Sequence, residues 1–499
     1  MGMLKRFLSS AVSLILTFSN FGIFAMKDNT VNSLITPSGI KCEQVESSID
    51  KFTSEFIGKN ISGAQVSVVK NGKIVFSKGY GLADRDNRLP VNRSTTFNYA
   101  SISKLFIWVS AMQLVEQGKL DLDKDIKEYL PKDYSLNITK SPVTFLNLMN
   151  HNAGFEAHWK YHSGSGESRD FCSLEEATCN CYSGIQCFEA GKVQGYSNYG
   201  ANLAAVIIEK ISGMPFYEYV NENIFKPCGM NTCYPERNPM ADVLHNKAKG
   251  YSCLGNGKFN IRPVYTGDWL YASGSVVGTA DDLSKFAVAL MPEKKECSPL
   301  FKSNETLNEM FKISYTPTNS ELFSMHHGFW GTDGNYRGVG HTGCVEGMVS
   351  HFLVVPNEKF SVSVLVNDES GWDIAYGVTS LLTGSDYTES TEFKDGTEIF
   401  EGEYVNARTQ LANRESDFDI ITVKSLDSAN IELKVNTVSK KYRRIGQYLF
   451  ENITDTCGRD FKAKLYFKVV NRKVEKVVTF KNDLIPIVRL QKFREVILQ

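Results

Sequence analysis

The sequence has no excess of charge of either sign. Its 55 Lys and Arg side chains balance 56 Asp and Glu side chains, leaving a formal net charge of -1 over 499 residues. A protein that holds nucleic acid or an anionic membrane through its overall field needs a basic excess. The composition therefore argues against a nucleic-acid partner, and none is expected.

Proline and long apolar runs are also scarce. The 14 Pro and 38 Gly are too few for a collagen-like or low-complexity chain, and the sequence is 42% hydrophobic and 22% charged, as in globular proteins. Beyond residue 25, no stretch has 18 consecutive apolar residues, so no further membrane span is predicted. A globular chain of this length is expected to form more than one core.

Several sequence motifs of enzymes are missing. The chain has no G-x-S-x-G elbow, no phosphate-binding loop and no G-x-G-x-x-G fingerprint. His158 and His162 have helical i, i+4 spacing, but the glutamate of the zinc-protease pattern does not lie between them. No metal and no cofactor are therefore expected.

The N-terminus carries a targeting pattern. Lys5 and Arg6 precede an apolar stretch, Phe7 to Ala25, that ends in a small residue. This pattern predicts a signal peptide over residues 1–25, with a linker over 26–40 and a secreted or periplasmic protein. An uncleaved anchor is the alternative, because 19 residues almost reach the length that spans a bilayer. Membrane contact is expected only through this segment, if it stays uncleaved.

Cysteine usage is consistent with export. Four of the 11 cysteines are clustered, at positions 172, 179, 181 and 187. In an oxidising compartment such a cluster favours disulfides, and the spacing lacks the paired C-x2-C typical of structural zinc. Cys228 and Cys233 flank a turn and could also pair.

The hydrophobic pattern predicts a mixed α/β (α+β) fold for residues 41–384. Apolar residues recur at helical spacing near both 45–56 and 101–118, and two β runs flank Asn71-Gly72. Strands from both ends of this region, with helices between them, predict an antiparallel sheet flanked by helices with a helical insert subdomain. The expected elements are helices at 45–56, 101–118 and 201–211, and strands at 64–69, 74–80, 348–355 and 360–366.

The C-terminal region has a different sequence pattern. A charged linker is predicted over 385–398, followed by short β-rich runs with polar turns over 399–499. Closely spaced short strands predict a small all-β barrel or sandwich, which we expect to be a separate domain.

One pair of residues suggests nucleophilic catalysis. Ser101 and Lys104 lie three apart at the start of a predicted helix and therefore share a face. A neighbouring lysine can activate a serine hydroxyl, and a helix N-terminus stabilises developing negative charge. Ser48 and Lys51 fit the same pattern, for which an exposed helical pair is expected.

Two further triplets accompany Ser101. Tyr196-Ser197-Asn198 begins 95 residues after Ser101, and His341-Thr342-Gly343 begins 145 residues after Tyr196. Their order and spacing resemble the three motifs of the serine β-lactamase and penicillin-binding-protein superfamily, specifically its class C β-lactamase and D-Ala-D-Ala carboxypeptidase branch. The resemblance covers about residues 45–370 and includes the segments 151–154 and 278–282.

The resemblance implies a β-lactamase/transpeptidase-like fold and roles for individual residues. Ser101 would form an acyl-enzyme, with Lys104 and Tyr196 handling its proton; which of the two is the base stays open. Asn198 would orient Lys104 and the substrate amide, and the backbone N–H groups of Ser101 and Cys344 would form the oxyanion hole. The substrate-binding residues so implied are Asn198, His341, Thr342, Gly343 and Cys344.

Two positions depart from the family pattern. His341 stands where class C β-lactamases usually carry lysine, and a histidine is mostly neutral at pH 7, so it is a weak partner for a substrate carboxylate. This favours a peptidase or esterase over a β-lactamase. Cys344 could narrow the pocket or provide a disulfide partner.

The expected function is therefore an exported serine hydrolase that acts on a small-molecule or peptide amide or ester. A catalytically silent scaffold that keeps the fold is the alternative, against which the three intact motifs argue. The sequence predicts no oligomeric state.

Overall fold

The computed structural model describes residues 35–155, 173–181, 184–235, 246–263, 271–293, 296–318, 321, 324–331, 338–384, 392–406, 420–455, 463–480 and 485–489. The predicted signal peptide and the histidine pair 158 and 162 lie outside these ranges. None of the helices within them is both long enough and apolar enough to span a bilayer.

A large antiparallel sheet forms the centre of the first region, in the order β3-β2-β1-β13-β12-β11-β10-β9. It joins the first hairpin to the late strands, because β1 pairs with β13 along its length, from Ala64↔Val366 to Lys70↔Phe360. Its strands are β1 Gly63–Lys70, β2 Lys73–Asp84, β3 Leu89–Pro90, β9 Met325–His326, β10 Phe329–Gly331, β11 Val339–Val345, β12 Met348–Val355 and β13 Phe360–Val366.

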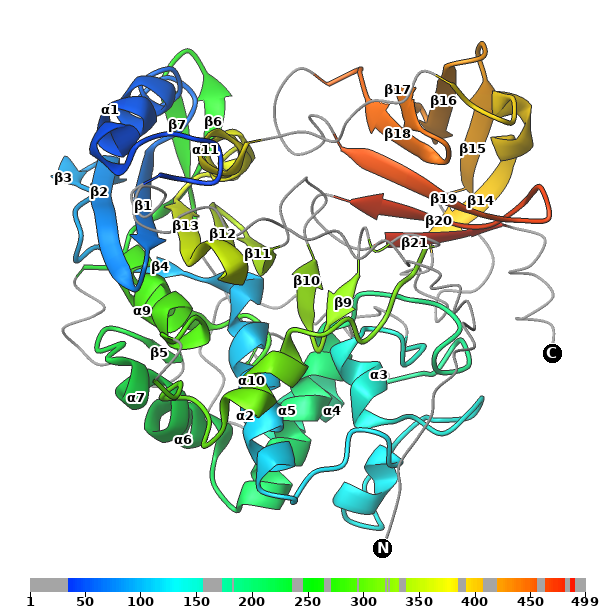
Figure 1. Cartoon of the computed structure of the whole chain (residues 1–499), viewed down its shortest axis with the longest axis horizontal. Helices are drawn as coiled ribbons and strands as arrows, with labels where there is room; N and C mark the ends of the chain where they lie inside the picture. Colours follow the sequence, from blue (N-terminus) through cyan, green and yellow to red (C-terminus); the bar gives the residue numbers. More distant parts are fainter. Residues whose placement is uncertain are drawn as a thin grey trace, which may run out of the picture.

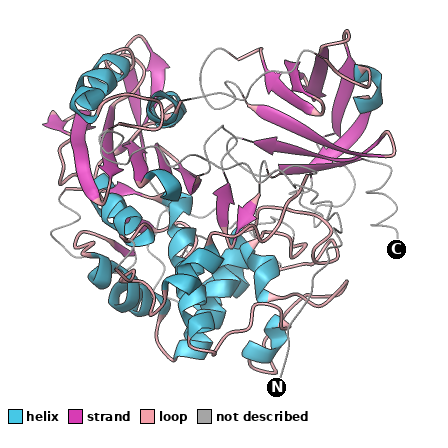
Figure 2. Cartoon of the chain, in the orientation of Figure 1, coloured by secondary structure: helices cyan, strands magenta, loops and turns pink. Residues whose placement is uncertain are grey.

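Helices cover both faces of this sheet (Figure 2). On one face, α1 (Cys42–Thr53) and α11 (Trp372–Thr383) pack on side chains such as Val66 and Val364. On the other, α2 (Ser103–Glu116) and α9 (Ala280–Leu290) pack on Phe352 and Leu365. All residues of β1 and β13 are consequently buried, as in strands that are covered on both sides.

A helical region is inserted between the first and last strands (Figure 1). Its central helix, α2, is buried at every position from Ser103 to Leu114, so it is a core helix and not the one-faced helix that its pattern predicted. The other helices of this region are α3 Phe145–Met149, α4 Leu174–Cys181, α5 Asn198–Ser212, α6 Phe216–Val220, α7 Lys226–Cys228 and α10 Asn304–Met310. Small sheets join β4 Phe97–Asn98, β5 Tyr234–Pro235 and β8 Val276–Gly278, and pair β6 Gly250–Gly255 with β7 Lys258–Arg262.

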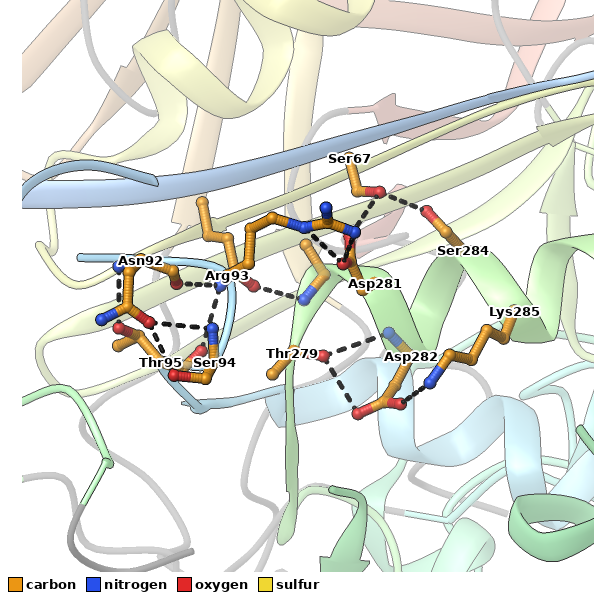
Figure 3. A network of polar contacts seen from close by, with 12 residues as sticks. Ser67, Asn92, Arg93, Ser94, Thr95, Thr279, Asp281, Asp282, Ser284 and Lys285 are labelled. Atoms are coloured by element: carbon orange, nitrogen blue, oxygen red, sulfur yellow. Dashed lines mark hydrogen bonds and ion pairs between the residues drawn. The ribbon is translucent and has the colours of Figure 1, made fainter. Parts of the chain in front are cut away.

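Polar contacts fasten α9 to the sheet (Figure 3). Asp281 accepts hydrogen bonds from Ser67 of β1 at 3.0 Å and from Arg93 at 2.6 Å and 2.9 Å. The helix begins at Ala280, and its capping residue is Thr279, whose Oγ1 accepts a hydrogen bond from the Asp282 N–H at 3.1 Å. Asp281 and Asp282, in the first turn of the helix, therefore both have structural contacts.

The C-terminal strands close into an eight-stranded antiparallel barrel, in chain order from β14 to β21 (Figure 1). Closure comes from the pairing of β14 with β21, for example Val405↔Val488. The strands are β14 Gly402–Asn406, β15 Ile420–Ser425, β16 Asn430–Val435, β17 Val438–Gly446, β18 Leu449–Asn452, β19 Lys464–Val470, β20 Lys473–Phe480 and β21 Ile485–Arg489. The fold class is thus confirmed, with a barrel at the C-terminus; the domain boundaries at 384, 385, 398 and 399 stay predictions.

The disulfide that Cys228 and Cys233 could form is absent from the structure. Both carry free thiols, and Cys233 Sγ lies in the core, 3.3 Å from the Tyr99 hydroxyl. Burial and the nearby charge of Asp282 raise the pKa of Cys233 well above its usual range. Cys172 lies outside the described residues, so the disulfides of the cysteine cluster stay a prediction.

Candidate active site

Ser101 lies in a short 3₁₀ turn, η2 (Ala100–Ile102), that leads into α2. Its position depends on Ala100, which adopts a φ of 49° although it has a side chain. Such a conformation costs about 1–3 kcal/mol and persists only where the surroundings enforce it. Here the Ala100 N–H donates to Asn98 Oδ1 at 2.6 Å, and Ser350 Oγ donates to the Tyr99 carbonyl at 2.8 Å. The backbone before the serine is therefore fixed from two sides.

Lys104 lies directly beside the serine. Its side chain is 0% exposed, and Nζ donates hydrogen bonds to Ser101 Oγ at 3.1 Å and to the Ser273 carbonyl at 2.7 Å. Ser273 is held in turn, since its N–H donates to Asn202 Oδ1 of α5 at 3.1 Å. The sequence assigned the orientation of Lys104 to Asn198, whereas in the structure Ser273 provides that contact.

Tyr196 joins this pair from the loop before α5. Lys104 Nζ lies 4.9 Å from the centroid of its ring, and the tyrosine is 3% exposed. The imidazole of His151 packs against the ring at 4.4 Å between centroids, and the Trp330 indole at 5.8 Å. His151 is fixed because its Nδ1 accepts a hydrogen bond from the Ser197 N–H at 3.2 Å.

His341 lies on another side of the group formed by Ser101, Lys104 and Tyr196. Its ring packs against Trp330, with the centroids 4.1 Å apart and the planes tilted by 32°, and lies 6.1 Å from the Tyr196 ring. Its Nδ1 bonds the Thr342 carbonyl, and a carbonyl only accepts, so Nδ1 carries the proton and Nε2 presents a lone pair. Burial, and then the charge of Lys104, lower the pKa of His341 to about 3. The imidazole is therefore neutral at pH 7.

The side chains of the motif His341-Thr342-Gly343 lie on two different faces of β11. His341 and Gly343 pair with Phe352 and Ser350, on the face that packs against η2, while Thr342 pairs with His351, on the face that packs against α11. Cys344 alternates with Gly343 and shares the face of Thr342. Its side chain therefore points away from Ser101 and does not narrow the site.

Gly343 allows β11 to approach the nucleophile. A Cβ at this position would lie 2.4 Å from the Tyr99 carbonyl oxygen and 2.9 Å from Ala100 Cβ, which no side chain tolerates. In the described residues, β10 pairs with β11 only at Val339 and Gly340, so the edge of β11 beyond Gly340 faces η2. This arrangement is suited to an oxyanion hole made of the N–H groups of Ser101 and Cys344.

Four buried polar atoms around this group have no hydrogen-bond partner among the described residues. They are Asn198 Oδ1, Ser273 Oγ, Trp330 Nε1 and His341 Nε2. A buried polar atom without a partner costs about 1–3 kcal/mol, so its retention needs a reason. Ser273, Trp330 and His341 each contact Lys104 or lie beside the Tyr196 ring, so three of these atoms belong to residues around the same group.

The structure brings together most, but not all, of the predicted group. Ser101, Lys104, Tyr196 and His341 converge, while the side chains of Thr342 and Cys344 lie on the other face of β11. Ser48 and Lys51 lie on α1, where Lys51 is exposed, in agreement with a surface pair.

Sequence reasoning missed His151, Ser273 and Trp330. The segment 151–154, which is part of the family resemblance, is the signal that could have indicated His151. Ser273 contributes through its carbonyl and Trp330 lies on a three-residue strand, so neither has a sequence signal. In the ranges that the structure covers, no three His, Cys, Asp or Glu side chains converge as metal ligands would.

Comparison with known proteins shows which family the chain belongs to. Residues 49–377 match the beta-lactamase family. The chain is 22% identical over 322 residues to Protein flp of Staphylococcus aureus (strain N315) and 30% identical over 279 residues to the putative penicillin-binding protein PbpX of Bacillus subtilis (strain 168). These alignments cover 64% and 55% of this chain, and the chain spans 62% and 63% of the length of these curated relatives.

A solved structure extends the likeness beyond the family match. The octameric penicillin-binding protein homologue from Pyrococcus abyssi superposes with a TM-score of 0.59 at 23% identity, covering 90% of this chain and 100% of the other. At this identity the likeness concerns the fold, and its coverage includes part of the C-terminal barrel. Since the family match alone spans well over half of the residues, the chain belongs to the beta-lactamase family.

Proposed function

We propose that this protein is a serine hydrolase that cleaves an amide or ester bond through an acyl-enzyme on Ser101. The observation that carries the proposal is the 3.1 Å contact between the fully buried Lys104 Nζ and Ser101 Oγ, beside the Tyr196 ring. A hydroxyl becomes a competent nucleophile when a group at this distance takes its proton. The three groups come from two separate segments of the chain, which fits a functional arrangement better than a local surface pair.

The proposed reaction has two halves. Ser101 Oγ attacks the substrate carbonyl while its proton passes to Lys104 and Tyr196, which act as a coupled pair. The carbonyl oxygen becomes an oxyanion that the N–H groups of Ser101 and Cys344 stabilise, and the proton then goes to the leaving amine or alcohol. Water, giving its proton to the same pair, attacks the acyl-enzyme and releases the acid and the free serine.

His341 supports a substrate that has no carboxylate at this end of the site. A neutral imidazole provides no counter-charge, and its Nε2 lone pair accepts a hydrogen bond from an N–H or O–H group. The neighbouring Trp330 Nε1 is a donor only and suits a neutral carbonyl. We therefore place amide or ester hydrolysis, as in a D-amino-acid peptidase or an esterase, ahead of β-lactam hydrolysis.

The N-terminal sequence supports export as a second part of the proposal. The basic residues and the apolar run before Ala25 are those of a signal peptide, and the protein would act as a secreted or periplasmic enzyme. N-terminal sequencing of the protein recovered from outside the cytoplasm should begin at Met26. A chain that retains Met1 in the membrane fraction would instead establish the anchored alternative.

Active-site labelling tests the catalytic proposal. A fluorophosphonate should label the wild-type protein with one equivalent, and intact-mass and peptide analysis should place the adduct on Ser101. Ser101→Ala should stay unlabelled, whereas Ser48→Ala, which changes the serine of the surface pair, should be labelled like the wild type. A folded wild-type protein that resists fluorophosphonate, ester, amide and penicillin probes would instead indicate a silent scaffold.

A further inference from the structure

A row of apolar side chains on the outer surface of the barrel is buried. Along barrel strands, side chains alternate between the interior and the outside. The interior set includes Phe450, Leu465 and Val477, so the adjacent residues point outward. These outward residues, which we call the barrel row, are Ile445, Leu449, Tyr466 and Val478, and they are exposed by only 2%, 1%, 8% and 0%.

The barrel row is contiguous. Leu449 pairs directly with Tyr466, and Tyr466 pairs with Val478, across three neighbouring strands, β18, β19 and β20. Among the other described residues of the barrel strands, Lys424, Lys434 and Lys441 are exposed, as is typical of a face in water. The burial of the row is therefore specific to one side of the barrel.

The partners of the barrel row belong to the active site. Its residues form one apolar cluster with Tyr196, with Met325 of β9 and with Trp330 of β10. Figure 1 shows β9 and β10 beneath the barrel strands β19 to β21. Lys104 Nζ lies over the Tyr196 ring, and the Trp330 ring packs against His341, so the cluster joins the barrel row to two residues that also contact the active-site groups.

The turn that carries the row is rigidly held. Arg444 is 4% exposed and donates to the Asp395 carbonyl at 2.6 Å and to the Gln447 carbonyl at 3.1 Å. Its guanidinium also lies 4.2 Å from the Phe393 ring centroid. The Gln447 side chain accepts a hydrogen bond from the Lys394 N–H at 3.0 Å, so the segment before the barrel fixes the β17–β18 turn between Ile445 and Leu449.

Aromatic rings pack in the described interior of the barrel. Phe400, Tyr404, Phe450 and Phe467 lie 4.7–6.3 Å apart between ring centroids. Side chains packed in this way form a core that supports the barrel strands from the inside.

We propose that the barrel row positions Tyr196 and Trp330 for acyl transfer, so that the hydrolytic site is complete only with the C-terminal barrel docked. The inference rests on the proposed function. The row residues are positioning residues, since they contact the site residues and not the reacting atoms. If a side chain of the row is truncated, Tyr196 or Trp330 can move into the space that it leaves. Small displacements of residues that position reacting groups lower the rate of acyl transfer strongly.

A matched pair of leucines tests the proposal. Leu449 and Leu465 are both 1% exposed and lie on adjacent strands, but Leu449 faces the hydrolase region and Leu465 the barrel interior. Leu449→Ala should lower the rate of fluorophosphonate labelling of Ser101 by tenfold or more, and Leu449→Met, which keeps the volume, should restore it. Leu465→Ala should lower the melting temperature by a similar amount and leave the rate within twofold. The labelling rates of all the variants are measured at a temperature at which circular dichroism shows that each variant is fully folded.

A second readout keeps this test separate from the proposed function. Leu449→Ala, but not Leu465→Ala, should increase hydrogen–deuterium exchange in peptides covering Met325 to Gly331. If the wild type is labelled and the two alanine variants label at equal rates, the positioning role is wrong while the hydrolase proposal stands. If the wild type is unlabelled, the hydrolase proposal fails. If hydrogen–deuterium exchange over Met325 to Gly331 is then also equal in both alanine variants, the contact between the barrel row and the site residues is excluded as well.

Discussion

His341 shows how neighbouring groups decide what one side chain recognises. The Thr342 carbonyl fixes the proton on Nδ1, and burial together with Lys104 keeps the ring neutral. A lysine at this position would instead bring a permanent charge. The choice of residue therefore determines whether this end of the site prefers a charged or a neutral group.

This leads to a prediction about specificity. His341→Lys should raise the ratio of kcat/KM for an N-acylated D-alanyl-D-alanine over its C-terminal amide by about 10- to 100-fold, because a hydrogen bond to a charged group is worth about 1.5–3 kcal/mol. The two substrates differ only in the carboxylate, and His341→Asn is the neutral control. An unchanged ratio in the lysine variant would mean that position 341 does not face this part of the substrate.

His341 also predicts how stability depends on pH. Its pKa falls from 6.5 to about 3 on folding, so between these pH values the unfolded chain binds the proton and the folded chain does not. The free energy of unfolding should therefore fall as the pH falls from 6.5 towards 3, by up to about 1.4 kcal/mol per pH unit from this group.

Urea unfolding at pH 7.5 and pH 5 measures this dependence. His341→Gln removes the ionisable group, so its free energy of unfolding should fall less between the two pH values than that of the wild type. Comparing the changes, and not the absolute values, removes the packing cost of the substitution. If the free energy of unfolding changes equally in the two proteins between pH 7.5 and pH 5, the pKa of His341 is not lowered on folding.

At the scale of elements, Asp281 is one of several polar groups that attach α9 to β1, beside Ser284, which donates to Ser67 at 2.8 Å. Asp281, whose side chain is 15% exposed, binds the fully buried Ser67, while its other partner, Arg93, is 62% exposed (Figure 3). An exposed ion pair contributes little, whereas a buried hydroxyl that loses its acceptor is costly.

The two partners of Asp281 therefore differ in their predicted effect. Asp281→Ala should lower the free energy of unfolding by about 1–3 kcal/mol, and Arg93→Ala by less than about 1 kcal/mol, both measured by urea unfolding. Ser101 should be labelled in both variants. Equal losses in the two variants would indicate that the ion pair, and not the bond to Ser67, fastens the helix.

Elements with strong local signals were predicted well. The first hairpin turns at Asn71-Gly72, where both residues have the positive φ that this dipeptide favours, 51° and 72°. The strands at 348–355 and 360–366 coincide with β12 and β13 because both runs are rich in valine and other apolar residues and have turn residues between them. In contrast, β17 (Val438–Gly446) is rich in lysine and arginine, and β9 and β10 are only two and three residues long. These three strands have no clear local signal and are defined by their pairing with neighbouring strands.

At the scale of the whole molecule, the barrel and the hydrolase region share one cluster of side chains. Tyr196, Trp330 and Leu449 come from segments more than a hundred residues apart, and all three are buried in one cluster. No periodicity in the sequence relates them, since the outward residues of a barrel strand look the same whether water or another region covers them. The contact between the two regions could therefore not be predicted.

The sequence alone determined the family-like motifs, the alternation of helices and strands, and the change to β structure after residue 385, because these depend on local pattern and spacing. The tertiary structure decided which atoms meet: Ser273 and not Asn198 holds Lys104, His341 is neutral, and the barrel row covers Tyr196 and Trp330. These features depend on burial and on distances between remote segments. Such quantities arise only when the chain is folded.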